Sequence, residues 1–359
     1  MKIERVPKLL KKSFKELGAF QKGEKRLIKT GYECIDCHIG GALPGDIILI
    51  SALSGQGKSE TLFRMKDNIL NPAINEGAEN FAFLDISLEM KMFNIVLRSV
   101  HRKLNKTKRQ ILFEEFTEEE KKIAKAYYDS VVSDERQYIS QTPTTSYEFY
   151  EGTKKFLQEH ADKEAVFVTL DHMLLISGGD KKKALEETIE YMNRLKLEFD
   201  NCYFIILSQM NRSILGRIAD KDNNSAPNTG DQYGSEFMNQ VCSYNIVLFN
   251  AYKVGIDKYL KVNPNRYDYL AEHFAPGEGK KRSFETVGKL FFHVLKVREG
   301  EAVFKDLFIE DMDMDQNMIE QLKQESEDKD GGSVVSDDDE VPVFGETVAM
   351  KNARDNDNF

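Results

Sequence analysis

The chain carries a candidate phosphate-binding loop at residues 52–59, which read Ala-Leu-Ser-Gly-Gln-Gly-Lys-Ser. An apolar run at 47–50 precedes the loop, and a segment with helical spacing at 61–69 follows it. Loop amides and a helix N-terminus converge on phosphate oxygens when a strand and a helix flank the loop in this order. The sequence therefore predicts binding of a nucleoside triphosphate.

The side chains of this loop suit ATP and Mg²⁺. Lys58 is expected to reach the β- and γ-phosphates, and the hydroxyl of Ser59 is expected to ligate Mg²⁺. Two glycines, Gly55 and Gly57, allow the backbone to approach oxygen atoms that a Cβ would obstruct. The full set of expected nucleotide contacts is Ser54, Gly55, Gln56, Gly57, Lys58, Ser59 and Glu60.

Two carboxylates close later apolar runs and are candidates for the hydrolysis step. Asp171 ends the run at 166–171, where an acid would hold Mg²⁺ or its water, with helix capping as the alternative role. Glu89 follows the run at 81–87 and is the candidate general base that polarises the attacking water. An acidic residue favoured by a helix dipole is the alternative reading of Glu89.

A third candidate, Gln209, follows the apolar run at 203–208. Its uncharged amide is expected to contact the γ-phosphate and to transmit the loss of that phosphate to the segment that follows. The segment that follows, 213–234, is long and polar, and we expect it to be mobile. A mobile loop joined to a γ-phosphate contact is one way in which hydrolysis becomes movement.

Seven short apolar runs alternate with longer helical patterns from residue 46 onward. Continuous apolar runs are typical of strands covered on both faces, as in a largely parallel α/β sheet flanked by helices. The last two runs have no helix between them and are expected to form an antiparallel edge. The expected strands are 47–52, 81–87, 166–171, 203–208, 245–249, 290–297 and 303–309.

The chain is expected to have three parts. Residues 1–29 form a short amphipathic helix, ended by Gly18, and a basic linker. Residues 30–310 form one nucleotide-binding α/β domain with a polar insertion at 251–288. Residues 311–359 have the composition of a disordered tail.

The acidic tail dominates the net charge of the chain. It holds fifteen Asp and Glu against four Lys and Arg, a net charge of −11. The whole chain has a formal charge of −10, so the remainder stands at +1, the difference between the two values. Local basic patches can form there, and the overall acidity does not exclude a nucleic-acid partner.

The string Cys34-Ile35-Asp36-Cys37-His38 matches the attachment signal of a c-type haem. Haem attachment needs an exported chain and a zinc site needs a second Cys pair, whereas the other cysteines stand apart. The four cysteines are therefore expected to be small buried hydrophobic residues. No apolar run is long enough to cross a bilayer and no secretory signal is recognised, so we expect no membrane partner and a cytoplasmic location.

Several motifs in order along the chain resemble one family, the DnaB-like replicative DNA helicases of superfamily 4, whose motor domain has a RecA-like P-loop NTPase core. The resemblance covers roughly four-fifths of the chain, and the order of its motifs makes coincidence a poor explanation. Its motifs are Thr30-Gly31-Tyr32, Gly40-Gly41-Ala42-Leu43-Pro44-Gly45-Asp46, the phosphate loop, Ser87-Leu88-Glu89-Met90, Gln141-Thr142-Pro143, the run ending at Asp171, Leu207-Ser208-Gln209-Met210-Asn211-Arg212-Ser213 and Lys296-Val297-Arg298-Glu299-Gly300.

The resemblance implies a ring, expected to be a hexamer, that hydrolyses ATP between subunits and moves along single-stranded DNA to unwind duplex. In this family the Lys-x-Arg-x-Gly motif serves the neighbouring subunit's nucleotide, so Arg298 is the implied arginine finger acting in trans and Lys296 its companion. The DNA-binding segment resembles the family only loosely. The cations expected to contact DNA are Arg212, Arg217 and Lys221.

Other implications concern partners and origin. The family's amino-terminal collar domain has no counterpart in this sequence, and the first helix resembles the family's linker helix, which packs on the adjacent motor. The compact form suggests a phage-encoded protein in a host cytoplasm. The acidic tail, ending in Phe359, resembles tails that bind replication proteins such as a polymerase, a primase or a single-strand-binding protein.

A RecA-like or KaiC-like ATPase, acting in recombination or regulation without unwinding, is the alternative class. A solvating role is the alternative for the tail.

Overall fold

Strand β1 (Ile47–Ala52) lies near the middle of an eight-stranded sheet with the order β10-β9-β6-β1-β5-β4-β2-β3. The strands from β6 to β3 are parallel, while β9 runs antiparallel to both of its neighbours, β6 and β10. The expected α/β fold, mostly parallel with an antiparallel edge, is confirmed. The other strands of this sheet are β2 (Phe81–Ser87), β3 (Gln137–Ser140), β4 (Ala165–Asp171), β5 (Cys202–Gln209), β6 (Tyr244–Phe249), β9 (Lys289–Val297) and β10 (Leu307–Asp311).

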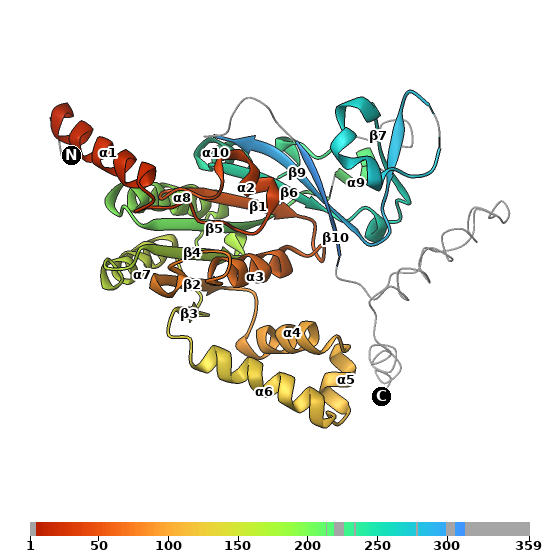
Figure 1. Cartoon of the computed structure of the whole chain (residues 1–359), viewed down its shortest axis with the longest axis horizontal. Coiled ribbons are helices and arrows are strands. Elements are labelled where there is room, and N and C mark those ends of the chain that lie inside the picture. The colour runs from red at the N-terminus through yellow and green to blue at the C-terminus, as the bar shows by residue number, and fades with distance from the viewer. Residues whose placement is uncertain are drawn as a thin grey trace, which may run out of the picture. The chain divides into compact units, whose positions relative to one another are not determined.

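Helices cover both faces of the sheet (Figure 1). Alternate β1 side chains point to opposite faces, so that Ile48 and Ile50 join one core while Ile47 and Leu49 join another. The first core includes side chains of α2 and α3, and the second includes side chains of α7, α8 and α10. These helices are α2 (Glu33–Ile39), α3 (Lys58–Ile69), α7 (Ser146–Glu159), α8 (Lys181–Glu198) and α10 (Ser235–Val241).

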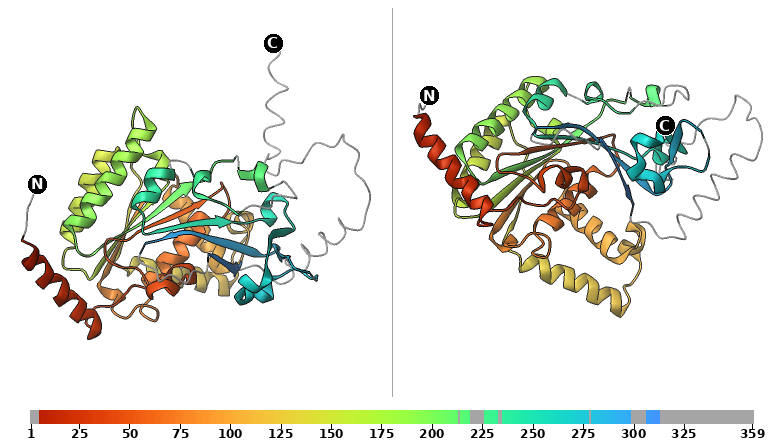
Figure 2. Two further views of the ribbon diagram at one scale, coloured as in Figure 1. Left: turned by 90° about the horizontal axis from the view of Figure 1, so that it is seen from above. Right: turned by 45° about the horizontal axis from the view of Figure 1, so that its top comes forward.

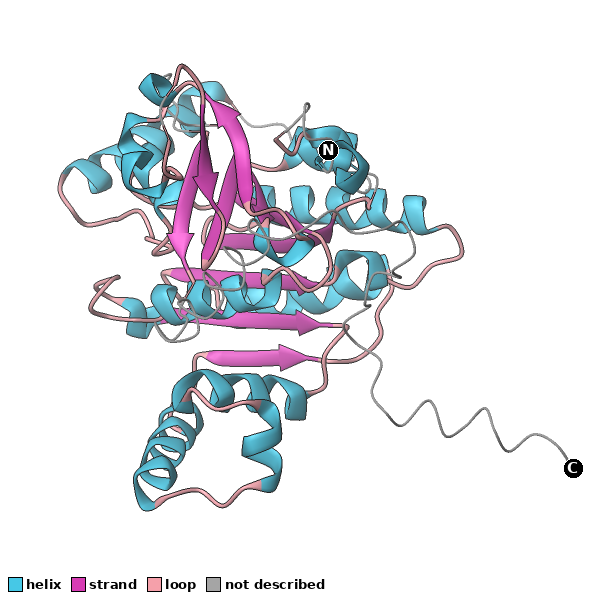
Figure 3. Cartoon of the chain, turned by 90° about the vertical axis from the view of Figure 1, so that its right-hand side faces the viewer, coloured by secondary structure: helices cyan, strands magenta, loops and turns pink. Residues whose placement is uncertain are grey.

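A group of three helices lies beyond the edge strand β3 (Figure 3). Capping boxes start two of them, where Thr107 and Thr117 accept hydrogen bonds from backbone amides three residues later. The group carries exposed apolar side chains, of which Phe113 is 80% exposed. The helices are α4 (Met92–Leu104), α5 (Lys108–Phe113) and α6 (Glu118–Val132).

The insertion at 251–288 forms a third hydrophobic core together with side chains of β6, β9 and β10. The insertion contains a separate two-stranded sheet, β7 (Lys258–Val262) with β8 (Arg282–Glu285). Fully buried aromatic side chains of these strands, Tyr259 and Phe284, pack in one cluster with Leu53 of the phosphate loop. The insertion therefore supports the end of the sheet from which the residues 52–59 loop extends.

Helix α1 (Val6–Gln21) projects at the amino terminus (Figure 2) and buries none of its side chains. It continues through Gly18, so the expected helix end there was wrong. A single glycine weakens a helix without breaking it. The helix ends at Gln21, and the chain turns away after Lys22, at Gly23, whose φ is +73°. The short helix α9 (Ile214–Ile218) follows β5.

The computed structural model describes residues 5–212, 214–218, 226–232, 235–277, 279–298 and 306–312. The chain divides into a unit from Met1 to Asp313 and a unit from Met314 to Phe359, and the second unit lies outside the described residues. Within the described parts, no helix combines the length and apolar character needed to span a membrane.

The expected strands are confirmed apart from shifts of one or two residues at their ends, except that 303–305 lie outside the described residues. Strands β3, β7 and β8 were not expected. Three cysteines are buried as expected, whereas Cys37 is exposed. Cys37 lies in the last turn of α2, where it is exposed although Cys34 and Ile35 in the first turn are buried.

Candidate active site

The phosphate loop joins β1 to α3 at the carboxyl edge of the parallel strands. Gly55 and Gly57 have φ angles of +76° and +97°, a region that side chains with a Cβ disfavour. Helix α3 starts at Lys58, so its free amides face the loop. Lys58 is only 9% exposed, and its ammonium donates to the carbonyl of Ala52 at 3.2 Å. Burial lowers the pKa of Lys58, against the opposing charges of Asp171 and Glu89.

A hydroxyl and a carboxylate meet beside Lys58. The hydroxyl of Ser59 donates to Oδ2 of Asp171 at 3.1 Å. Asp171 is 6% exposed, and burial raises its pKa although Ser59 and Lys58 act in the opposite direction. Its other oxygen, Oδ1, is buried without a hydrogen-bond partner among the described residues. A hydroxyl and an orphaned carboxylate oxygen fit Mg²⁺, which takes one or two protein ligands together with substrate phosphates.

Glu89 lies next to this pair. The peptide after β2 is held to the end of β4 by the amide of Leu88, which donates to the Asp171 carbonyl at 2.6 Å. Glu89 is exposed, and its charge acts on the pKa of both Lys58 and Asp171. An exposed carboxylate beside a buried ammonium is suitably placed to activate water near a bound phosphate.

Gln209 ends β5 and lies opposite Ala52 in the parallel pairing of β5 with β1. Its side chain forms a hydrogen bond with His172, a residue that sequence reasoning missed. His172 is 7% exposed, and burial and the nearby Lys58 charge lower its pKa. Its position directly after Asp171 is the feature of the sequence that could have marked it as a site residue. Arg98 of α4, whose charge lowers the pKa of Asp171, carried no signal in the sequence.

The remaining loop residues have different surroundings. Ser54 is exposed, whereas Gln56 is 3% exposed and exchanges two hydrogen bonds of 3.3 Å with the backbone of Asn250. The ammonium of Lys253 donates to the Gly55 carbonyl at 2.6 Å. The loop is thus fixed from the insertion side.

Glu60 lies on α3 and forms ion pairs with Arg64 and Arg102, at 3.3 and 3.4 Å. These contacts direct it toward α4.

Lys296 and Arg298 lie at the edge of the sheet formed by the amino ends of the parallel strands, opposite the carboxyl edge that carries the phosphate loop. Strand β9 runs antiparallel to β6, so Val297 pairs with Tyr244, which in turn pairs with Ile48 near the start of β1. The five residue steps along β1, at about 3.3 Å each, separate its two ends by about 17 Å. This exceeds the reach of an arginine side chain. The structure therefore does not bring these two cations to the phosphate loop of their own chain.

At their own edge, the two cations bind the last carbonyls of α10. Lys296 donates to the carbonyls of Asn239 and Gln240, and Arg298 donates to Gln240 at 2.5 Å. Positive charge at a helix C-terminus is favourable, because the free carbonyls there carry partial negative charge.

The family model of the DnaB-like helicase C-terminal domain matches residues 28–258 of the chain. The chain belongs to this family. No curated protein is similar enough in sequence to be matched to it.

Solved structures show the same fold. The ATPase domain of G40P aligns with a TM-score of 0.61 at 15% identity, over 86% of this chain and 94% of the other. A DnaB-like replicative helicase, solved in a study of its interactions with primase, aligns with a TM-score of 0.59 at 14% identity. That alignment covers 86% of this chain and 64% of the other.

The cations expected to contact DNA in this DnaB-like chain have three different settings. Arg212 is exposed, three residues after the end of β5. Arg217 of α9 pairs with the nearly buried carboxylate of Asp231 at 2.5 Å. Lys221 lies outside the described residues, as does most of the segment around it.

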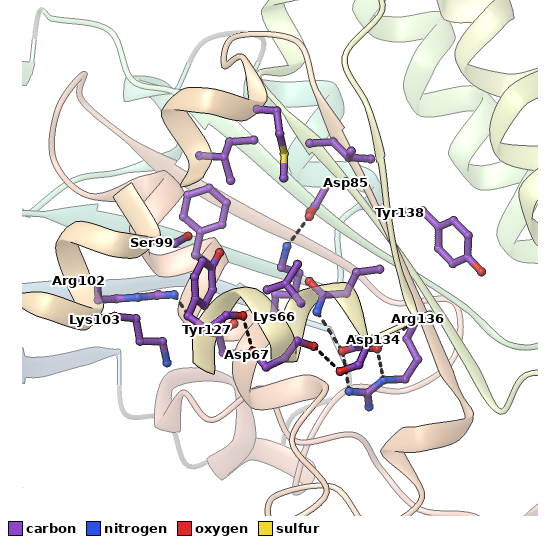
Figure 4. A pocket seen from close by; sticks show the side chains of 18 residues that line it. Lys66, Asp67, Asp85, Ser99, Arg102, Lys103, Tyr127, Asp134, Arg136 and Tyr138 are labelled. Atoms are coloured by element: carbon purple, nitrogen blue, oxygen red, sulfur yellow. Dashed lines mark hydrogen bonds and ion pairs between the residues drawn. The ribbon is translucent and has the colours of Figure 1, made fainter. Parts of the chain in front are cut away.

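A cavity of about 610 Å³ lies further along α3, between it and helices α4 and α6 (Figure 4). Charged side chains line it in pairs, Lys66 with Asp85 and Arg136 with Asp134. Arg136 also donates to the carbonyls of Leu70 and Ala78, at 2.9 and 2.8 Å. The Lys66 pair thus ties α3 to β2, and Arg136 ties the residue before β3 to the backbone at the end of α3, so these charged side chains have structural roles.

Proposed function

We propose that this chain is the ATP-driven motor of a replicative DNA helicase that assembles as a ring, expected to be a hexamer. ATP would bind at the interface between copies, and hydrolysis would move the ring along single-stranded DNA and unwind duplex. The observation that supports this most strongly is the distance between the phosphate loop and the Lys296 and Arg298 cations. Two edges that cannot meet within one chain can meet between two copies in a head-to-tail ring.

Each site would take residues from two chains. Lys58 and the loop amides would bind the phosphates, and Ser59 with Asp171 would hold Mg²⁺, which neutralises charge on the phosphate oxygens. Glu89 would accept a proton from the attacking water. From the neighbouring copy, Lys296 and Arg298 would stabilise the charge that develops on the transferred phosphoryl group.

Movement would begin at Gln209. Its amide would contact the γ-phosphate, and the segment that follows it would shift when the phosphate leaves. Arg212, Arg217 and Lys221 are the proposed contacts to the DNA backbone. Arg217 would contact a DNA phosphate either while it stays paired with Asp231 or after the phosphate replaces Asp231 as its partner.

Assembly would use α1. Its apolar side chains are exposed, Val6 by 65% and Phe14 by 69%, and a helix of this length is marginal on its own. Packing of this stripe on the adjacent copy would stabilise both the helix and the ring. The acidic tail ending in Phe359 would recruit a polymerase, a primase or a single-strand-binding protein. Phage origin and a host cytoplasm stay predictions of the sequence.

The decisive experiment measures ATP turnover with and without single-stranded DNA, together with the mass of the assembly in the presence of nucleotide. We expect closed rings and turnover that rises with DNA. Arg298→Ala should abolish the stimulated turnover while nucleotide binding survives. A monomer whose turnover ignores DNA would contradict the proposal, and filaments without unwinding would favour the RecA-like or KaiC-like class.

A further inference from the structure

A network of buried amide side chains crosses the core between the two edges of the sheet. Gln232 donates through Nε2 to Oγ of Ser51 at 3.0 Å and to Oδ1 of Asn245 at 2.6 Å. Asn245 donates through Nδ2 to Oε1 of Gln232 at 3.0 Å and to Oδ1 of Asn239 at 3.1 Å. Exposure is 0% for Ser51 and Asn245 and 3% for Gln232. A fully bonded buried network fixes the relative positions of the elements that contribute to it.

One end of the network lies beside the candidate nucleotide site. Ser51 directly precedes Ala52 and the phosphate loop. Gln232 pairs as an isolated bridge with Met210, the residue after Gln209. The amide of Met210 in turn donates to the Ala52 carbonyl at 3.1 Å.

The other end lies at the Lys296 and Arg298 cations. Asn239 receives the Asn245 amide on its side chain and offers its backbone carbonyl to Lys296. Asn245 also lies directly opposite Lys296 in the pairing of β6 with β9, where a bulge follows it. Asn245 is therefore connected to Lys296 twice, by the strand pairing of β6 with β9 and by the hydrogen bonds through Asn239 of α10.

We propose that Asn245 is a positioning residue for Lys296 and Arg298, acting through the end of α10 that its side chain holds. This inference rests on the proposed function, in which the two cations complete the neighbouring copy's site. Asn245 would not touch the nucleotide. It would set the position of the α10 carbonyls that hold the two cations, and it would link that position to Ser51 and Met210 beside the chain's own nucleotide.

The test uses Asn245→Leu in the full chain, with ATP turnover measured in the presence of single-stranded DNA. We expect kcat to fall by about ten- to a hundredfold while KM for ATP changes by less than about twofold, because misplacing a catalytic group by about 1 Å costs up to a hundredfold. Binding of a fluorescent ATP analogue should stay unchanged. Asn75→Leu is the matched control, since Asn75 is 6% exposed and its amide bonds the backbone at Lys29 and Asn68, which do not belong to the Asn245 network.

A double-mutant cycle with Lys296→Met separates positioning from general destabilisation. We expect Asn245→Leu to add little to the loss caused by Lys296→Met, whereas the effect of Asn75→Leu should multiply with it. If Asn245→Leu behaves like Asn75→Leu in both measurements, the positioning role is wrong. If Lys296→Met alone leaves turnover unchanged, the proposed function fails instead.

Asn239→Ala covers the case in which Asn245→Leu does not fold. It removes only the acceptor side chain of the half-buried Asn239 and leaves the carbonyl that binds Lys296. The same selective loss of kcat, non-additive with Lys296→Met, is expected. Normal kcat in a folded Asn239→Ala variant would overturn the inference.

Discussion

Two inactive variants of this chain are expected to restore each other's activity when they assemble together. Lys58→Ala removes the ammonium of the phosphate loop and leaves the Arg298 edge intact, whereas Arg298→Ala does the reverse. Arg298→Ala alone should lose about a thousandfold or more in turnover, the effect typical of an arginine finger. Lys58→Ala should be inactive because phosphate binding loses its cation.

The size of the recovery follows from the positions of the two edges. An interface in a head-to-tail ring pairs the loop edge of one copy with the cation edge of the next. It is intact only where an Arg298→Ala copy supplies the loop and a Lys58→Ala copy supplies the cations. In an equal mixture this holds at about one quarter of the interfaces, so turnover should approach about one quarter of the wild-type value if interfaces act independently.

The assay needs assemblies that contain both variants. The two chains are given different affinity tags, expressed together and purified through both tags, and ATP turnover is compared with that of each variant alone. If the interfaces hydrolyse ATP one after another, the recovered turnover would be lower, but it would still exceed the turnover of either variant alone. Doubly purified assemblies that are no more active than either variant would refute catalysis between copies.

Three further outcomes are expected. Burial raises the pKa of Asp171, which means that its charged form costs folding free energy at neutral pH and that this cost falls as pH is lowered through its pKa. Asp171→Asn should therefore raise the melting temperature without nucleotide while abolishing Mg²⁺-dependent turnover, and a lower melting temperature would contradict the assignment. Gly57→Ala, at a φ of +97°, should cost about 1–2 kcal/mol of stability and weaken nucleotide binding, as measured by thermal melting and by titration with a fluorescent nucleotide. Burial raises the pKa of Glu310 to about 7, so stability should decline from about pH 5 to pH 8, by at most about 3 kcal/mol. Glu310→Gln should flatten that decline in melting temperature, and an unchanged slope would show that another group causes it.

The phosphate loop and its partners could be predicted because each follows an apolar run. The carboxyl ends of parallel strands share one edge of the sheet, so Lys58, Asp171 and Gln209 had to approach one another once the runs were read as parallel strands. The pairing of Ala52 with Gln209 and the bond between Ser59 and Asp171 follow from that arrangement.

Other features depend on tertiary contacts that no local pattern carries. Strand β3 has four residues, none of them fully buried, so it lacks the apolar run by which the other strands were recognised. The strands of the insertion are short, and Tyr259 and Phe284 could not be told from surface aromatics before their packing was known. The network through Asn245 joins residues from distant parts of the chain.

The direction of β9 determines how Arg298 can act. Had β9 run parallel to β6, its carboxyl end would lie at the edge that carries Ala52, and Arg298 could have reached the nucleotide of its own chain. Because β9 is antiparallel, the amide of Arg298 instead donates to Ser243, whose own amide bonds Ile47 at the far end of β1. In the proposed function, a cation fixed there serves the triphosphate of another copy. The antiparallel edge is thus the structural reason why a single chain should hydrolyse ATP slowly and an assembly should hydrolyse it well.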